Sequence, residues 1–451
     1  MPRALLLLPS ATYRAPDFLA AARALGVEVV VASDRRQALS GVLGDRALTL
    51  DLRDPEAAAR RIASLAERSP LDAIVAADDG GVIAAAHACE RLGLRGNPPA
   101  AAARTRDKAA LREALAVAGV PQPEFRVVEP GADVAALAAQ VGPPCVIKPL
   151  SLSASRGVIR ADDRRAAATA AERIRSILAE SGRDPAAERL LVERYEPGVE
   201  VAVEGLLVDG ELETLAVFDK PDPLEGPYFE ETLFVTPSRL PAATVRAVED
   251  AAGAAASALG LREGPVHTEL RVGPAGRVAV LELAARTIGG LCARTLRFGL
   301  GVSLEELVLR HALGLSLFGL RREEAAAGVM MLPIPAAGVL EEVRGRQRAL
   351  AVPGIAGLEL SILPGRPVRP LPEGDRYLGF LFARAGRAEE VEQALRTAHA
   401  ELDVRIVAPA AETPPSETSA PAADGSAPSS ATAPARAQAS PSSPPPAALA
   451  S

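Results

Sequence analysis

The sequence predicts a mixed α/β and α+β protein that begins with a doubly wound parallel sheet. Short apolar strand patterns alternate with helix patterns over residues 1–100, which is typical of such a sheet. Residues 101–312 are expected to form a second unit, in which residues 124–312 are richer in strands and predict an α+β fold, and residues 313–408 predict a small C-terminal α+β domain. Residues 409–451 are rich in proline, alanine and serine. They carry too little apolar surface to form a core, so we expect a disordered tail.

The elements of the first 100 residues follow from strand runs bounded by turn residues and from helical spacing of apolar residues. The expected strands are Ala4–Leu8, Val27–Ala32, Leu48–Leu50 and Leu71–Ala77. The expected helices are one that ends near Gly26, then Pro55–Arg68 and Gly81–Leu92. The first strand-to-helix turn, residues 9–16, has no glycine fingerprint for a dinucleotide. A nicotinamide site is therefore not expected.

The following segments are assigned by the same signals. A helix is expected at Thr105–Ala118, with Thr105 as its N-cap. Further helices are expected at Arg164–Glu180, Thr244–Leu259 and Ala388–Leu402. The expected strands are Pro144–Pro149, Arg189–Arg194, Glu200–Val208, Leu212–Phe218, a hairpin within Val266–Gly290, and Val404–Val407.

Composition excludes several classes of protein. The 451 residues carry a net charge of −7 without a basic run, and aromatic residues make up 3%. Both facts argue against a nucleic-acid partner. Three separated cysteines in apolar segments fit buried thiols better than a disulfide or zinc site. The apolar N-terminal run is short for a signal peptide and no run is long enough to span a membrane, so we expect a cytoplasmic protein with no membrane partner.

The hairpin is the most informative segment of the chain. Residues 273–276 supply a turn between two alternating runs. If Val272 pairs with Arg277, Glu269 lies opposite Val280 and His267 opposite Glu282. Glu269 and Glu282 then share one face of the sheet. Two close carboxylates favour a bound Mg²⁺, whereas the alternative is an ordinary solvated strand face.

Two other segments are suited to binding an anion. In Cys145–Gly157 a buried strand leads into Lys148 and then into a loop with Ser151, Ser153 and Ser155. Such a loop can turn backbone N–H groups and hydroxyls toward phosphate. Lys108 lies on the preceding helix, where a solvated lysine is the simpler interpretation. The alternative for the loop is an ordinary surface connection.

Three more segments carry polar groups suited to a ligand. Glu193 ends a strand, and Glu200, Ala202 and Glu204 share a face of the next one. The long proline-rich loop Phe218–Ser238 has the length of a binding loop or lid. Arg286 in the segment Ala285–Gly290 could hold a carboxylate or phosphate, beside two glycines that let a substrate approach. Each of these features also fits an ordinary surface.

The order of these features resembles that of the ATP-grasp superfamily. Within it, the segments HTELRV, LELAARTIGG and DKPDPLEGPYFEE make the chain similar to carboxylate–amine ligases of the L-amino-acid ligase type. The resemblance covers residues 1 to about 408 and implies two α+β subdomains that clamp ATP. It further implies an ADP-forming ligase that acts through an acyl phosphate and joins an amino acid to another amino acid or a small amine.

The resemblance also implies a role for each site residue. ATP would be bound by Lys108, Lys148, Ser151, Ser153, Ser155, Gly157, Glu193, Tyr195, Glu200 and Lys220. Within that set, Glu193 and the Tyr195 backbone would meet adenine, Glu200 would hold the ribose, and the serine loop would close over the phosphates. Glu269 and Glu282 would hold Mg²⁺, with Mn²⁺ as an alternative ion. Lys148 and Arg286 would be catalytic, and the substrate residues would be His267, Arg286, Gly289 and Gly290.

One residue departs from the family pattern. Many ATP-grasp enzymes have asparagine two residues after the second glutamate, where this chain has Ala284. That departure leaves open an ATP-binding regulatory protein without catalysis. A purine-pathway-type or carboxylase-type ATP-grasp ligase is a further alternative, which differs in substrate. The resemblance also implies small-molecule carboxylate and amine substrates and a homodimer.

Overall fold

The computed structural model describes residues 1–10, 12–36 and 44–408. The tail expected at 409–451 lies outside the described residues. Within them, no helix combines the length and the apolar character needed to cross a membrane.

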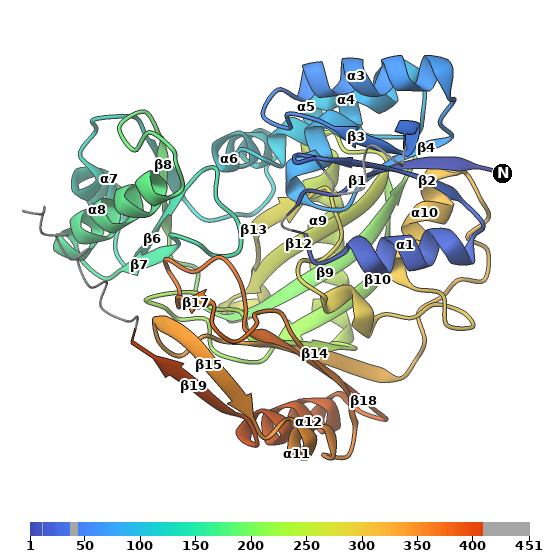
Figure 1. Cartoon of the computed structure of the whole chain (residues 1–451). Helices are drawn as coiled ribbons and strands as arrows, with labels where there is room; N and C mark the ends of the chain where they lie inside the picture. The colour runs from blue at the N-terminus through green and yellow to red at the C-terminus, as the bar shows by residue number, and fades with distance from the viewer. Residues whose placement is uncertain (11, 37–43, 409–451) are drawn as a thin grey trace, which may run out of the picture. The chain divides into compact units, whose positions relative to one another are not determined.

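The N-terminal sheet is parallel, with strand order β3-β2-β1-β4, and carries helices on both faces (Figure 1). Helices α1 and α10 cover one face, and α3 and α4 cover the other. The doubly wound prediction is therefore confirmed. The strands are β1 (Arg3–Leu7), β2 (Glu28–Ser33), β3 (Ala47–Thr49) and β4 (Ala73–Ala76). The helices are α1 (Ala15–Ala24), α3 (Pro55–Arg68), α4 (Val82–Leu92), α5 (Pro99–Arg104), α6 (Lys108–Val117) and α10 (Leu304–Ala312).

A second, antiparallel sheet has the order β5-β8-β6-β7 and packs against α7 and α8. We refer to residues 125–194 as the β5–β8 unit. Apolar residues on one face of α8, from Ala167 to Leu178, close its core. Its elements are β5 (Phe125–Val128), α7 (Val134–Val141), β6 (Cys145–Pro149), β7 (Ile159–Ala161), α8 (Arg164–Glu180) and β8 (Leu190–Arg194).

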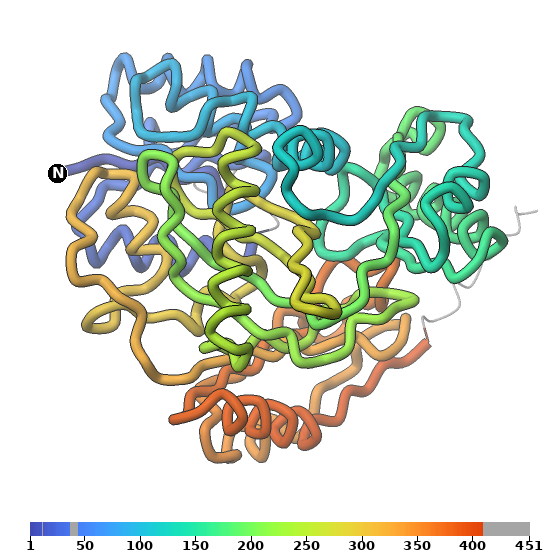
Figure 2. The backbone as a smooth tube through the Cα atoms, turned by 180° about the vertical axis from the view of Figure 1, so that it is seen from behind, coloured from blue at the N-terminus to red at the C-terminus, as the bar shows by residue number. Residues whose placement is uncertain are grey.

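The largest sheet is antiparallel, with the order β13-β12-β9-β10-β11-β14-β18-β16. Helix α9 crosses one face of its first strands (Figure 2), and together they bury a core that includes Val203, Val248 and Leu270. The opposite face carries the polar residues described below. The strands are β9 (Val199–Val208), β10 (Glu211–Lys220), β11 (Leu233–Thr236), β12 (Gly264–Val272), β13 (Val278–Ala284), β14 (Ala326–Leu332), β16 (Ile355–Leu360) and β18 (Gly379–Ala385), and α9 is Ala242–Leu259.

The C-terminal segment contributes to this sheet and also forms a small sheet of its own. Strands β14, β16 and β18 continue the large sheet, whereas β15 pairs with β17 and β19. The large sheet therefore continues across the domain boundary expected at residue 313. The remaining elements are β15 (Gly338–Arg344), α11 (Arg346–Leu350), β17 (Pro367–Val368), α12 (Ala388–Ala400) and β19 (Asp403–Val407).

Two expectations for local structure are wrong. The helix predicted at Thr105–Ala118 begins at Lys108, and its N-cap is Asp107, whose carboxylate accepts from the amides of Ala109 and Ala110. Thr105 ends the preceding helix instead. The long loop predicted at 218–238 contains strand β11, which pairs with β14. A strand of this kind is not predicted by the local sequence pattern.

Candidate functional site

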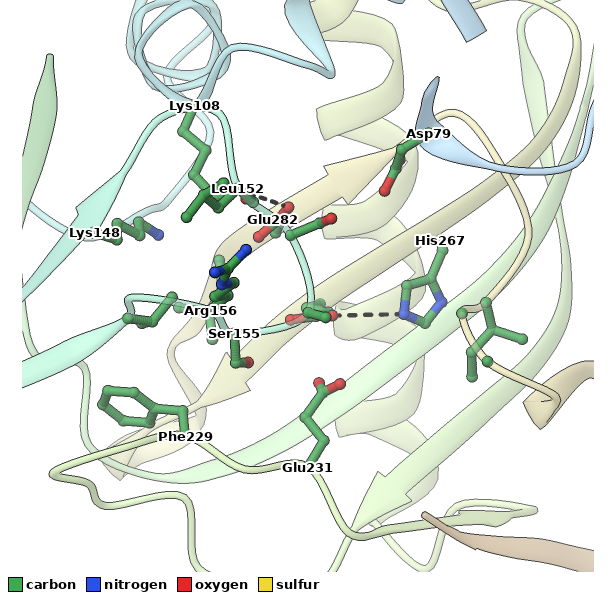
Figure 3. Close-up of a pocket in the computed structure, with 18 of the residues that line it drawn as sticks. Asp79, Lys108, Lys148, Leu152, Ser155, Arg156, Phe229, Glu231, His267 and Glu282 are labelled. Carbon is green, nitrogen blue, oxygen red and sulfur yellow. Dashed lines mark hydrogen bonds and ion pairs between the residues drawn. The ribbon is translucent and has the colours of Figure 1, made fainter. Parts of the chain in front are cut away.

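A cavity of about 530 Å³ collects most of the residues that the sequence singled out. Its lining comes from the N-terminal sheet, the β5–β8 unit and the large sheet (Figure 3). Gly157 and Lys220 are not among the lining residues. The predicted residues that do line it are Lys108, Lys148, Ser151, Ser153, Ser155, Glu193, Tyr195, Glu200, His267, Glu269, Glu282, Arg286, Gly289 and Gly290.

The hairpin places both glutamates on one face, but with a different register from the predicted one. Val272 pairs with Val278, and Leu270 with Val280. A bulge at Leu281 then brings Glu282 directly opposite Glu269. The predicted pairing of Val272 with Arg277 is wrong, and so is the placement of Val280 on the polar face, because Val280 is buried in the core.

The neighbouring strand β9 extends the same polar face. Glu200 lies opposite Arg271, Ala202 opposite Glu269, and Glu204 opposite His267. The expectation that Glu200, Ala202 and Glu204 share a face is confirmed. This face turns to the cavity because the alternate residues of both strands pack beneath α9.

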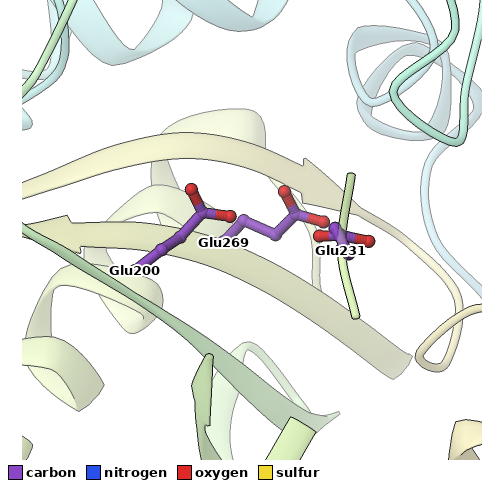
Figure 4. Close-up of side chains that lie close together, drawn as sticks. All are labelled: Glu200, Glu231 and Glu269. Atoms are coloured by element: carbon purple, nitrogen blue, oxygen red, sulfur yellow. The ribbon is translucent and has the colours of Figure 1, made fainter. Parts of the chain in front are cut away.

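Lys220 on β10 lies opposite Glu200 and therefore on the same face, beside three carboxylates that lie close together (Figure 4). Its Nζ is 2.7 Å from Glu200 and 3.7 Å from Glu269, and it also binds Glu231. Burial alone would lower the pKa of Lys220, but the carboxylates raise it well above its usual value. Burial raises the pKa of Glu231 to about 7, whereas Lys220 and His267 hold the pKa of Glu269 below its usual value against the effect of burial.

The facing glutamates fit a divalent cation. Carboxylate oxygens are the ligands that Mg²⁺ prefers, and directly opposed residues have Cβ atoms only about 5 Å apart. Here they are accompanied by cationic groups, with Lys108 Nζ 3.2 Å from Glu282. Ala284 lies buried opposite His267 and offers no ligand atom. The carboxylate ligands that the hairpin offers to a cation are therefore Glu269 and Glu282.

Lys148 is buried at one end of the cavity and forms an ion pair with Glu193 at 2.6 Å. Burial lowers the pKa of Lys148. The pKa of Glu193 is lowered despite burial, because both Arg112 and Lys148 bind its carboxylate. Sequence reasoning missed Arg112. A signal was present, since Arg112 shares the apolar face of its helix with Ala109 and Leu115.

Arg112 also explains the hairpin bulge. Its guanidinium donates to the carbonyls of Val280 at 3.0 Å and of Leu281 at 2.5 Å. A bulge interrupts the ladder and leaves backbone groups in need of partners, and a buried carbonyl without one is costly. Arg112 therefore stabilises the register that sets Glu282 opposite Glu269.

The serine loop has an unusual backbone. Ala154 and Ser155 have φ of 58° and 54°, in the left-handed region that side-chain-bearing residues rarely adopt. Gly157 has φ of 70°, and a Cβ there would lie 3.3 Å from the Pro149 ring. Lys108 Nζ donates to the Leu152 carbonyl at 2.9 Å, which holds the loop over the cavity (Figure 3). Strain at such loops is typical of ligand-binding segments.

Arg286 is held by the turn that follows β4 of the N-terminal sheet. Its Nε and Nη2 donate to the two oxygens of Asp79, each at 3.2 Å. Against the effect of burial, Arg286 and Arg106 lower the pKa of Asp79 to about 2. Sequence reasoning missed Asp79, although it lies three residues after parallel strand β4, and the carboxyl ends of such strands commonly form ligand sites.

His267 and the loop after β13 are held by one buried carboxylate, Glu204. Glu204 lies 3.1 Å from His267 Nδ1 and accepts from the Ile288 amide at 2.9 Å. Burial opposes protonation of His267, yet the carboxylates of Glu204 and Glu269 raise its pKa. The segment 286–290, with its two glycines, is therefore fixed to the polar face of the sheet.

The fold and cavity define the ATP-grasp class of protein, a β-sheet clamp around a charged cavity, and comparison with known proteins agrees. Residues 19–96 match the ATP-grasp N-terminal domain, 141–295 the ATP-grasp domain, and 330–407 the L-amino acid ligase C-terminal domain 2. The crystal structure of L-amino acid ligase from Bacillus licheniformis superposes with a TM-score of 0.74 at 24% identity, over 90% of this chain and 99% of that one.

Two curated relatives are similar in sequence. D-alanine–D-alanine ligase of Gloeobacter violaceus is 31% identical over 49% of this chain and 72% of its own. Alanine–anticapsin ligase of Bacillus subtilis is 30% identical over 56% of each chain. The chain spans only 56% to 65% of the length of the first curated relatives it matches. The chain belongs to the ATP-grasp ligase family, and its C-terminal region is of the L-amino acid ligase type.

Proposed function

We propose that the protein is an ATP-dependent, ADP-forming carboxylate–amine ligase that joins an amino acid to another amino acid or a small amine. The observation that carries the proposal is the convergence of Lys108, Lys148, Arg286 and the Glu269–Glu282 pair on one cavity. A substrate carboxylate oxygen attacks the γ-phosphorus of ATP, the bond to ADP breaks, and an acyl phosphate forms. An amine then attacks the acyl carbon, loses a proton, and displaces phosphate.

We assign the residues to two ends of the cavity. At the nucleotide end, Lys108, Lys148 and the serines at 151, 153 and 155 bind phosphate, with Gly157 shaping the loop. Glu193 and the Tyr195 backbone meet adenine, and Glu200 holds the ribose. Carboxylates accept several hydrogen bonds, so the existing partners of Glu193 and Glu200 leave acceptor sites for a ligand.

Between the two ends, Glu269 and Glu282 would hold Mg²⁺, or Mn²⁺ in its place, since Lys108 of the nucleotide end lies 3.2 Å from Glu282. When bound there, the ion would neutralise charge that develops on the phosphates. At the other end of the cavity, which we call the substrate end, Arg286 stabilises the acyl phosphate, and His267, Gly289 and Gly290 border the substrate. Lys220, with its three carboxylate partners, keeps Glu200, Glu231 and Glu269 in place.

The test is ADP and phosphate release across a panel of amino-acid pairs with Mg²⁺, together with mass spectrometry of the product. We expect amide product for at least one pair and none with Lys148→Ala. ATP binding without turnover of any pair would contradict the proposal. That outcome would favour the second candidate, a nucleotide-binding regulator, for which Ala284 is the supporting observation. Turnover only with a purine-pathway or carboxylase substrate would instead favour that type of ligase.

We also propose that residues 1–100, 101–312 and 313–408 act as three domains, that the protein is a homodimer, and that it acts in the cytoplasm. Sedimentation of the purified chain tests the homodimer, and a sedimenting monomer would contradict it.

A further inference from the structure

Arg173 lies outside the cavity but joins three segments that line it. On α8, its guanidinium binds both carboxylate oxygens of Glu373, at 2.6 and 3.0 Å. It also donates to the hydroxyl of Tyr228 and lies 5.0 Å from the centre of that ring. Planar, bidentate contacts of this kind orient both partners.

Two main-chain hydrogen bonds and one from a side chain join the same three segments. The Gly157 amide donates to the Pro372 carbonyl at 3.0 Å, and the Arg160 amide donates to the Pro227 carbonyl at 2.9 Å. Arg156 Nε donates to the Glu373 carbonyl at 3.1 Å. The segments 221–232 and 369–377 are therefore both fastened to the β5–β8 unit beside its serine loop.

Each segment also places side chains in the cavity. The β5–β8 unit contributes the serine loop, segment 221–232 contributes Phe229 and Glu231, and segment 369–377 contributes Arg376 and Tyr377. The serine loop belongs to the nucleotide end, whereas Tyr377 packs beside the core cluster that contains Ile288, at the other end. A single arginine thus connects segments that serve the two ends.

We propose that Arg173 is a positioning residue that makes the nucleotide end and the substrate end of the cavity assemble as one unit. The inference rests on the proposed ligase function. In coupled turnover an amine attacks the acyl carbon and phosphate leaves. When the substrate end is poorly positioned, water attacks the same acyl carbon and the C–O bond to phosphate breaks. The products are then the free acid, ADP and phosphate, without an amide. Loss of Arg173 therefore separates ATP consumption from product formation.

The variant Arg173→Met tests this proposal, with Arg165→Met as a matched control, because Arg165 is an exposed arginine on the same helix. For the wild type we expect one ADP per amide product. For Arg173→Met we expect the ratio of ADP released to amide formed to rise to roughly two or more. We expect the KM for ATP to rise about five-fold, which is the size of effect that a half-exposed ion pair supports. We expect kcat for ADP release to be retained.

The double variant Arg173→Glu with Glu373→Arg restores the ion pair with reversed charges and should lower the ratio again. An unchanged ratio and KM in Arg173→Met, or an equal change in Arg165→Met, would overturn the proposal. If the wild type binds ATP but forms no product, the proposed function fails. The proposal for Arg173 is then decided by ATP affinity, which should weaken in Arg173→Met and not in the control.

Discussion

The buried guanidinium of Arg112 makes a sharp prediction for Arg112→Met. Arg112 is 1% exposed and binds Glu193 together with two carbonyls of the hairpin bulge. Methionine fills part of the space but donates no hydrogen bond. Glu193 then keeps only Lys148 as a charged partner, and the carbonyls of Val280, which is buried, and of Leu281, which is partly buried, lose a donor.

Removal of one partner from a buried ion pair costs about 3–5 kcal/mol. Because Lys148 remains 2.6 Å from Glu193, we expect the lower end of that range, about 3 kcal/mol. Urea unfolding of wild type and variant measures the difference. Arg53→Met is the matched control, since Arg53 makes a bidentate contact with Asp51 in full solvent, and we expect no measurable change.

The pH dependence supplies a second readout. The pKa of Glu193 is lowered in the folded state, so its contribution to stability is present above its unfolded value near 4.5 and is lost as pH falls below it. Arg112→Met should weaken this dependence. A loss of unfolding free energy below about 1 kcal/mol, together with an unchanged loss of stability at acidic pH, would refute the argument that Arg112 supports both Glu193 and the bulge.

Three further predictions follow from the described contacts. Glu269→Gln and Glu282→Gln should each lower the rate of ADP release about 100-fold or more and raise the Mg²⁺ concentration needed for half-maximal activity. A Mg²⁺ titration at saturating ATP measures both effects. Retained wild-type Mg²⁺ dependence in both variants would contradict the assignment of the hairpin as the metal site. Asp79→Asn should lower the free energy of unfolding by roughly 2 kcal/mol at pH 7, because the pKa of Asp79 is lowered to about 2 in the folded protein. The variant should also lack the part of the stability that the wild type loses between pH 4 and about 2, which acid unfolding measures. Identical acid unfolding curves would show that the Arg286 contact contributes nothing. Burial raises the pKa of Cys89 to about 12 and of Cys145 to about 11, so a thiol reagent at pH 8 should react with both only after unfolding, and rapid reaction of the native protein would contradict their burial.

Much of the fold could be predicted because its signals are local. Helix bounds at Pro55–Arg68 and Arg164–Glu180 agree with the structure, since proline or an aspartate cap marks the start and apolar periodicity marks the length. The alternation of strands and helices in the first 100 residues likewise predicted a parallel sheet. Strand β11 was missed because four residues within a proline-rich loop are too few to show a period, and they form a strand through pairing with β10 and β14.

The site divides in the same way. By itself the sequence determined which residue types lie near one another along the chain: two lysines, a serine loop, and two glutamates on the two strands of one hairpin. Only the tertiary structure decided the partners of those residues. The bulge at Leu281, supported by Arg112 from a helix more than a hundred residues earlier, sets Glu282 opposite Glu269. Asp79 reaches Arg286 from the turn after β4, in the N-terminal part of the fold. Charge pairing depends on distance in space, which side-chain alternation along one strand does not encode.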